Sequence, residues 1–157
     1  MTNQDPVVGP ELAAFVRSGV ATVVATRGDD LRPEIARSWG PEVSPDGASV
    51  TLCVPAPPGS QTLTNLEGNG AITATFVLPT TYRALQIKGT VTDVREPTPE
   101  QLTRVEEHIA AFTDQVERIG VTSTQVRALV EPEYVAVTFA ARELYDQTPG
   151  PGAGSRL

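Results

Sequence analysis

Two neighbouring stretches, AITATFVL at residues 71–78 and YRALQIKGTVTDVRE at residues 82–96, decide the fold class. Both are rich in residues that favour β-strands, and only PTT separates them. In the second stretch, Leu85, Ile87 and Val91 fall on one face, and Gln86, Lys88, Thr90 and Thr92 fall on the other. This alternation predicts an antiparallel pair with one buried side. Gly89, in the middle, predicts a bulge or the close approach of another group.

Shorter β-rich runs precede this pair, at residues 20–27, 33–43 and 48–55. The turn signals GDD and SPDG separate these runs, which favours antiparallel pairing. Short helices are predicted at 10–19 and 60–70, because apolar residues recur there at helical spacing. The second of them begins at a serine, a residue suited to capping a helix.

The clearest helix covers residues 97–120, with Thr98 as its predicted cap, and a connector then leads to a last strand at 134–141. Together these elements predict a mainly β fold, an antiparallel barrel of six or so strands with helices outside. We expect one domain over residues 1–148. Residues 149–157 form a tail rich in glycine and proline, expected on the surface.

Composition narrows the function classes. The 157 residues carry 12 basic and 19 acidic side chains, a net charge of −7, which disfavours nucleic acid and anionic membranes as partners. No apolar run approaches the ~20 residues needed to span a bilayer, and the N-terminus lacks the pattern of a signal peptide. We therefore expect a cytoplasmic protein without membrane contact. Neither GxGxxG nor GxxxxGK[ST] occurs, which disfavours dinucleotide-binding and P-loop folds.

The chain has one cysteine, Cys53, and one histidine, His108. A single cysteine excludes a disulfide within the chain, and metal sites built from several cysteines or histidines are excluded as well. Cys53 lies in an apolar strand and is expected to be a small core residue rather than a nucleophile. Because His108 follows Glu106 and Glu107, we expect it at the surface or rim rather than in a catalytic role.

The order of these segments resembles the pyridoxamine 5′-phosphate oxidase-like FMN-binding split-barrel family over residues 8–140. The strongest cues are N-L-x-x-N-x-x-I-T-A-T-F at 65–76 and Y-R-x-L-x-I-x-G-x-V at 82–91. The resemblance implies a six-stranded antiparallel split β-barrel with flanking helices. It also implies a homodimer with two FMN sites at the subunit interface, and a flavin-dependent oxidoreductase acting on a small molecule.

The same resemblance indicates cofactor-binding positions. They are Arg37, Ser38 and Trp39 on the second strand, Cys53 on the third, Ser60, Gln61 and Thr62 at the phosphate clamp, and Gln86 on the long strand. The family's glutamine on this strand falls on Ala84 here, and Gln86 follows two residues later on the same face. Arg37 would hold the phosphate. In the family, the clamp reads Ser-Arg-Lys, so here the serine is kept and both cations are absent. The residues that recognise pyridoxal phosphate in the true vitamin B6 oxidase have no equivalent, so its substrate is not carried over.

Each of these positions has a structural alternative. Arg37 could form an ion pair with Glu34 or Glu42, and Ser60 with its neighbours could simply cap a helix. Trp39 could pack in an interface, and Gln86 could line a solvated face.

Two further functional hypotheses remain open. One is a non-catalytic relative that binds another small ligand without FMN. The other is an enzyme that uses a deazaflavin or haem in the same cleft, with His108 as the only imidazole available for haem.

Overall fold

The two deciding stretches form strands β5 (Ala71–Val77) and β6 (Ala84–Arg95) of the computed structural model, which describes residues 6–157. They pair antiparallel, from Ala71 opposite Thr90 to Val77 opposite Ala84. Leu85 and Ile87 are buried, as the alternation predicts. The paired strands therefore supply one wall of the core.

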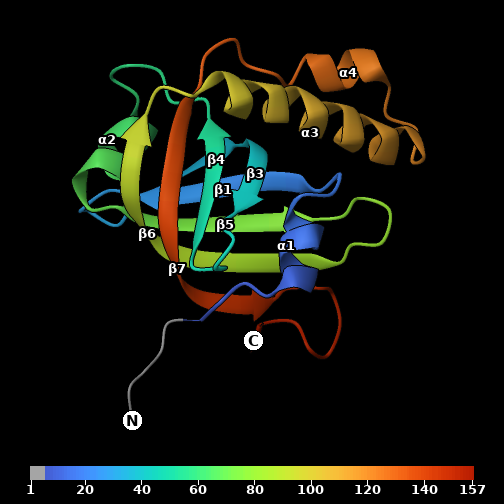
Figure 1. The fold of residues 1–157 in the computed structure, drawn as a ribbon, viewed down its shortest axis with the longest axis horizontal. Helices are drawn as coiled ribbons and strands as arrows, with labels where there is room; N and C mark the ends of the chain where they lie inside the picture. Colours follow the sequence, from blue (N-terminus) through green and yellow to red (C-terminus); the bar gives the residue numbers. More distant parts are fainter. Residues whose placement is uncertain (1–5) are drawn as a thin grey trace.

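The remaining strands complete one antiparallel sheet that curls into a half-barrel (Figure 1). They are β1 (Ala21–Arg27), β2 (Pro33–Arg37), β3 (Trp39–Val43), β4 (Ser49–Val54), β7 (Val135–Asp146) and the short β8 (Ser155–Arg156). The order across the sheet is β2-β1-β5-β6-β7-β4-β3, and β8 pairs with β7. The split-barrel fold class predicted from the sequence is confirmed. The strand count is higher than six, because one predicted strand is divided and β8 is added.

The divided strand is the segment at 33–43, which breaks at Ser38. Its first half, β2, pairs with β1, whereas its second half, β3, pairs with β4, so one segment joins the two ends of the sheet. Gly40 sits just after the break with a φ of 61°. A Cβ on Gly40 would lie 3.0 Å from the backbone nitrogen of Val105, so both the left-handed backbone and the close approach of α3 favour glycine.

Four helices surround the sheet: α1 (Pro10–Val16), α2 (Gln61–Gly68), α3 (Pro99–Glu117) and α4 (Ser123–Arg127). Figure 1 shows α1 and α2 at opposite ends of the horizontal strands, with α3 lying across the top of the sheet beside α4. Thr98 caps α3 in a reciprocal capping box with Gln101, which confirms the predicted start of this helix. The predicted connector after α3 contains the short α4.

The core has two parts. Inside the barrel, the buried side chains include Val24, Phe76, Ile87 and Phe139. A second cluster lies between the β3–β4 side of the sheet and α3, and its members include Trp39, Cys53, Ile109 and Phe112. Cys53 is therefore a core residue, as predicted.

His108 lies in this second layer with only 5% of its surface exposed, so the prediction of a surface position is wrong. Its Nδ1 accepts a hydrogen bond of 3.0 Å from the N–H of Gly40, and its Nε2 lies 2.8 Å from the carbonyl oxygen of Val20. A neutral ring protonated at Nε2 satisfies both contacts. Burial lowers the pKa of His108 from 6.5 to about 4, the Val20 contact opposing this, so the ring is neutral at pH 7.

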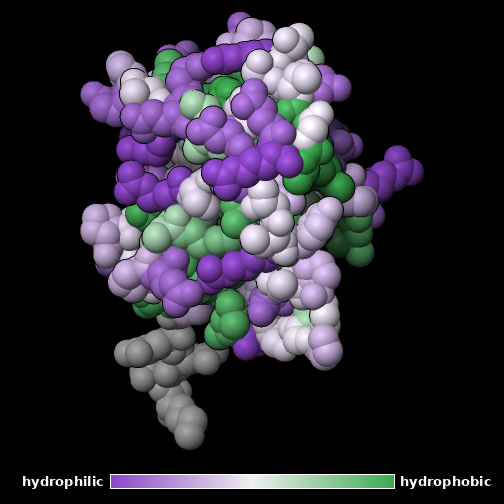
Figure 2. Space-filling view, turned by 90° about the vertical axis from the view of Figure 1, so that its right-hand side faces the viewer, coloured by the Kyte–Doolittle hydropathy of each residue, from purple (hydrophilic) through white to green (hydrophobic). Residues whose placement is uncertain are grey.

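The strand predicted at 134–141 corresponds to β7, which runs to Asp146, beyond the predicted end. The glycine- and proline-rich residues that follow lie on the surface and return the chain, so that Arg156 pairs with Tyr145. On the face shown in Figure 2, hydrophilic side chains predominate and hydrophobic residues form small separated patches. Within residues 6–157, none of the helices combines the length and apolar character needed to cross a membrane.

Candidate functional site

Two of the predicted phosphate-binding residues, Arg37 and Thr62, line one cavity of about 430 Å³. Arg37 is the last residue of β2, and Thr62 lies in the first turn of α2. The other lining residues come from β2, from the loop that leads to α2, and from the loop between α4 and β7: Ile35, Ala36, Pro55, Pro57, Leu129, Glu131, Pro132 and Glu133. The fold thus brings together three segments that are far apart in the sequence.

The start of α2 supplies hydrogen-bond donors beside this cavity. Ser60 caps the helix, and its Oγ accepts a 3.2 Å hydrogen bond from the N–H of Leu63, so the capping alternative for Ser60 is correct. The first N–H groups of a helix have no acceptor within the helix, which leaves those of Gln61 and Thr62 for solvent or a ligand. The Gln61 side chain instead donates to Oδ1 of Asn65 at 2.7 Å.

Arg37 supplies the positive charge of the cavity. It is half-buried, and no ion pair of Arg37 is found within residues 6–157. The ion-pair alternative with Glu42 is wrong, because Glu42 pairs with Arg104 at 2.6 Å. The guanidinium of Arg37 is therefore available to an anionic ligand group.

Two carboxylates, Glu131 and Glu133, oppose this charge at the edge of the cavity. Both residues are exposed, so water screens their repulsion of an anion. The donor set of Arg37, the Thr62 hydroxyl and the free N–H groups of α2 fits a phosphate monoester. It holds fewer cations than the Ser-Arg-Lys clamp of the family that the sequence resembles.

The lining loop at 129–133 was missed by sequence reasoning, which treated it as a plain connector. Its proline between two glutamates indicates an exposed loop before a strand. Nothing local indicates that it lies beside Arg37, because that proximity depends on how β7 joins the sheet.

Ser38, Trp39 and Cys53 are buried in the core and do not line the cavity, with at most 2% of each exposed. The Trp39 ring makes edge contacts with His108 and Phe112 at centroid distances of 5.5 and 5.7 Å. Burial raises the pKa of the Cys53 thiol to about 11, although the Arg104 charge opposes this, so it is protonated at pH 7. None of these three residues therefore lines the cavity.

Gln86 lies apart from Arg37, on the outer face of the sheet. The row of paired residues runs from Arg37 through Val23 and Thr75 to Gln86, which is three strand spacings or ~14 Å. Its side chain contacts Oγ1 of Thr75 at 3.4 Å and the Gln147 amide at 3.3 Å. Within one chain, Gln86 and Arg37 therefore do not share a phosphate-sized ligand group.

The histidine and the acidic residues are poorly placed to bind haem or a metal ion. Both ring nitrogens of His108 contact the backbone, so binding iron would break one of these contacts. Across residues 6–157, no group of three or more histidine, cysteine, aspartate or glutamate residues could hold a metal ion.

No protein-family model and no curated protein matches this sequence. Several solved structures share its fold. A candidate pyridoxamine 5′-phosphate oxidase from Lactobacillus delbrueckii is 13% identical in sequence, with a TM-score of 0.56. The match covers 92% of this chain and 97% of that protein.

Two further structures are an F420 reductase and an FMN-binding protein from Syntrophomonas wolfei. The reductase is 16% identical, with a TM-score of 0.53, covering 83% of this chain and 93% of its own. The FMN-binding protein is 15% identical, with a TM-score of 0.50, covering 85% and 84% respectively. The chain thus has the split-barrel fold of pyridoxamine 5′-phosphate oxidase-like proteins, which confirms the resemblance at the level of fold.

Proposed function

We propose that this protein binds FMN and acts as a flavin-dependent oxidoreductase on a small molecule. The observation that carries the proposal is the meeting of Arg37 and Thr62 in one cavity beside the start of α2. The fold, shared with an FMN-binding protein and an F420 reductase, supports the same class of cofactor.

Four residues that line the cavity have defined roles in this proposal. The Arg37 guanidinium holds the phosphate through charge-assisted hydrogen bonds, and the Thr62 hydroxyl and the N–H groups of α2 complete its coordination. Ile35 and Leu129 offer apolar surface next to these donors. The flavin supplies the redox chemistry, whereas the protein binds and orients it.

The complete site is proposed to need a second copy of the chain. Ile35 is 71% exposed on the outer face of β2, opposite Ala25 of β1. An isoleucine this exposed beside a ligand cavity suits an interface between subunits. Since three strand spacings separate Gln86 from Arg37 along the sheet of one chain, a partner chain could bring its own Gln86 to the cofactor.

The Arg37→Ala variant is expected to weaken FMN binding by about 10- to 100-fold, because a charge-assisted hydrogen bond contributes roughly 1.5–3 kcal/mol. Binding of riboflavin, which lacks the phosphate, is expected to change little. Titration followed by flavin fluorescence measures both affinities. Arg118→Ala, at the exposed arginine that follows the last residue of α3, is the matched control. Equal losses for FMN and riboflavin would contradict the assignment of Arg37 to the phosphate.

The Ile35→Glu variant is expected to shift the protein from dimer to monomer, because a carboxylate would be buried at the interface. Light scattering after size-exclusion chromatography measures the mass. Ile119→Glu changes an isoleucine that is 55% exposed near the end of α3, and serves as the control. A wild-type protein of 16.6 kDa in solution would reject the dimer.

A second candidate function is the binding of another small ligand without FMN. It is favoured by the absent cations at Gln61 and Thr62 and by the two carboxylates at the cavity edge. Titrating the protein with FMN and with F420 separates the possibilities. Saturable binding of FMN supports the first function, binding of F420 alone supports the deazaflavin alternative, and binding of neither supports the second candidate.

A further inference from the structure

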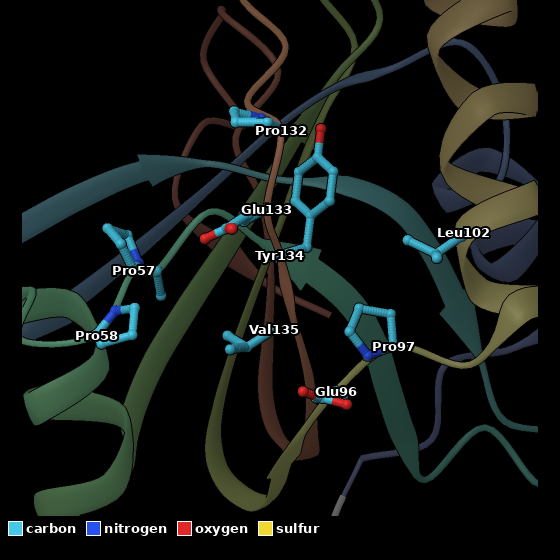
Figure 3. Close-up of a pocket in the computed structure, with 10 residues that line it drawn as sticks. Pro57, Pro58, Glu96, Pro97, Leu102, Pro132, Glu133, Tyr134 and Val135 are labelled. Carbon is cyan, nitrogen blue, oxygen red and sulfur yellow. The ribbon is translucent and has the colours of Figure 1, made fainter.

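A second cavity, of about 450 Å³, adjoins the cavity that contains Arg37 and Thr62. The two share Pro57, Pro132 and Glu133 as lining residues. Figure 3 shows Pro57 and Pro58 on one side of the second cavity, Pro97 and Leu102 on the other, and Tyr134 and Val135 between them. Arg37 and Thr62, assigned to the phosphate, and Ile35, assigned to the dimer, do not line this second cavity.

The walls are mostly apolar and rigid. Proline rings fix the backbone φ, so these loops lose little freedom when a ligand binds. The ring of Tyr134, a half-buried residue directly before β7, adds an aromatic surface. Such a lining suits the apolar body of a small molecule.

The charged residues that line the cavity all have the same sign. They are Glu96, which directly follows β6, and Glu133, and none of the described lining residues is basic. No ion pair of either carboxylate is found within residues 6–157. In the view of Figure 3, Val135 lies between them. A hollow with apolar walls and charges of one sign concentrates the opposite charge.

We propose that this cavity binds a small organic cation, whose positive charge is attracted by Glu96 and Glu133 on its walls. Its apolar body lies against the proline and leucine side chains. The Tyr134 ring can add a cation–π contact. The inference goes beyond the proposed function and does not depend on bound flavin.

The test uses three probes of nearly equal shape, namely benzamidine, benzamide and benzoate, which are cationic, neutral and anionic at pH 7. Each is titrated into the 15N-labelled full-length protein without flavin. Benzamidine is expected to shift the backbone amide signals of Ala56, Leu102, Tyr134 and Val135 in the millimolar range. Benzamide is expected to bind more weakly, and benzoate most weakly. Added salt is expected to lower only the benzamidine affinity.

The Glu96→Gln/Glu133→Gln double variant is expected to bind benzamidine about tenfold more weakly, since each exposed carboxylate contributes modestly. The Glu67→Gln/Glu117→Gln variant changes two exposed glutamates outside this cavity and has the same net charge. It is expected to bind like the wild type. Equal binding of benzamidine and benzamide, unchanged affinity in the first variant, or no localised shift would each overturn the proposal. Loss of FMN binding alone would leave it standing.

Discussion

The His108→Leu variant is expected to have a free energy of unfolding about 4 kcal/mol lower than that of the wild type. Leucine has a similar volume but cannot accept from the Gly40 N–H or donate to the Val20 carbonyl. Each buried backbone group left without a partner costs roughly 1–3 kcal/mol. Denaturation by urea, monitored through Trp39 fluorescence, measures the difference.

The same residue predicts a pH dependence. The unfolded chain binds a proton at His108 near pH 6.5, whereas the folded protein does so only near pH 4. Between these values the unfolded state carries more protons, so stability rises with pH and falls on acidification. The wild type is expected to lose roughly 3 kcal/mol from this residue between pH 6.5 and 4, and nothing further from it below pH 4.

The His108→Leu variant lacks this titration, so its stability is expected to depend less on pH over the same range. Carboxylates titrate in both proteins, and subtracting the two curves removes their common contribution. Glu107→Gln changes an exposed neighbour on α3 and is expected to keep the pH dependence of stability that His108 causes in the wild type. Parallel curves for wild type and His108→Leu would contradict a neutral, backbone-bound His108.

The Gly89→Ala variant is expected to lose about 3 kcal/mol or more of stability. A Cβ at this position would lie 2.2 Å from the carbonyl oxygen of Ala140 and 2.5 Å from Cδ2 of Phe139. Both are on β7, where its register with β6 shifts. Relief requires the two strands to separate in the middle of the sheet, and overpacking of this kind costs roughly 1–3 kcal/mol or more. Urea denaturation measures the loss.

Gly68→Ala provides the matched control, because a Cβ there meets nothing within 4 Å. Gly68 lies in α2, where alanine favours the helix, so this variant is expected to be neutral or up to about 1 kcal/mol more stable. If Gly89→Ala does not fold, its insoluble expression beside a soluble Gly68→Ala still supports the prediction. Equal stability of the two variants would contradict it.

The sequence predicted those strands and helices whose apolar residues recur at a regular spacing. The alternation at 71–96 gave the β5–β6 pair, and the mid-strand glycine indicated the close approach that Gly89 makes to β7. The break at Ser38 was missed, because it depends on pairing with two different strands. His108 was misplaced although the signal was present. It follows Val105 by three residues and precedes Phe112 by four, which puts it on the buried face of α3.

The candidate site was predictable only in part. The resemblance indicated Arg37 and Thr62, which the fold places in one cavity. Local periodicity could not show that these two residues lie close together. Glu131 and Glu133 follow Arg37 by more than ninety residues, so only the completed sheet shows that they oppose its charge. The separation of Gln86 from Arg37 likewise follows from the strand order.

The position of β7 has a consequence for how the chain is made. β7 lies between β6 and β4, so the last long strand to be synthesised joins the two parts of the sheet. A chain leaving the ribosome can form the β2-β1-β5-β6 group and the β3–β4 hairpin early, each with an open edge. Until residues 135–146 emerge, those edges can pair with other nascent chains. The barrel thus closes only after β7 has emerged, and a chain that stops before β7 exposes the unpaired edges of β6 and β4.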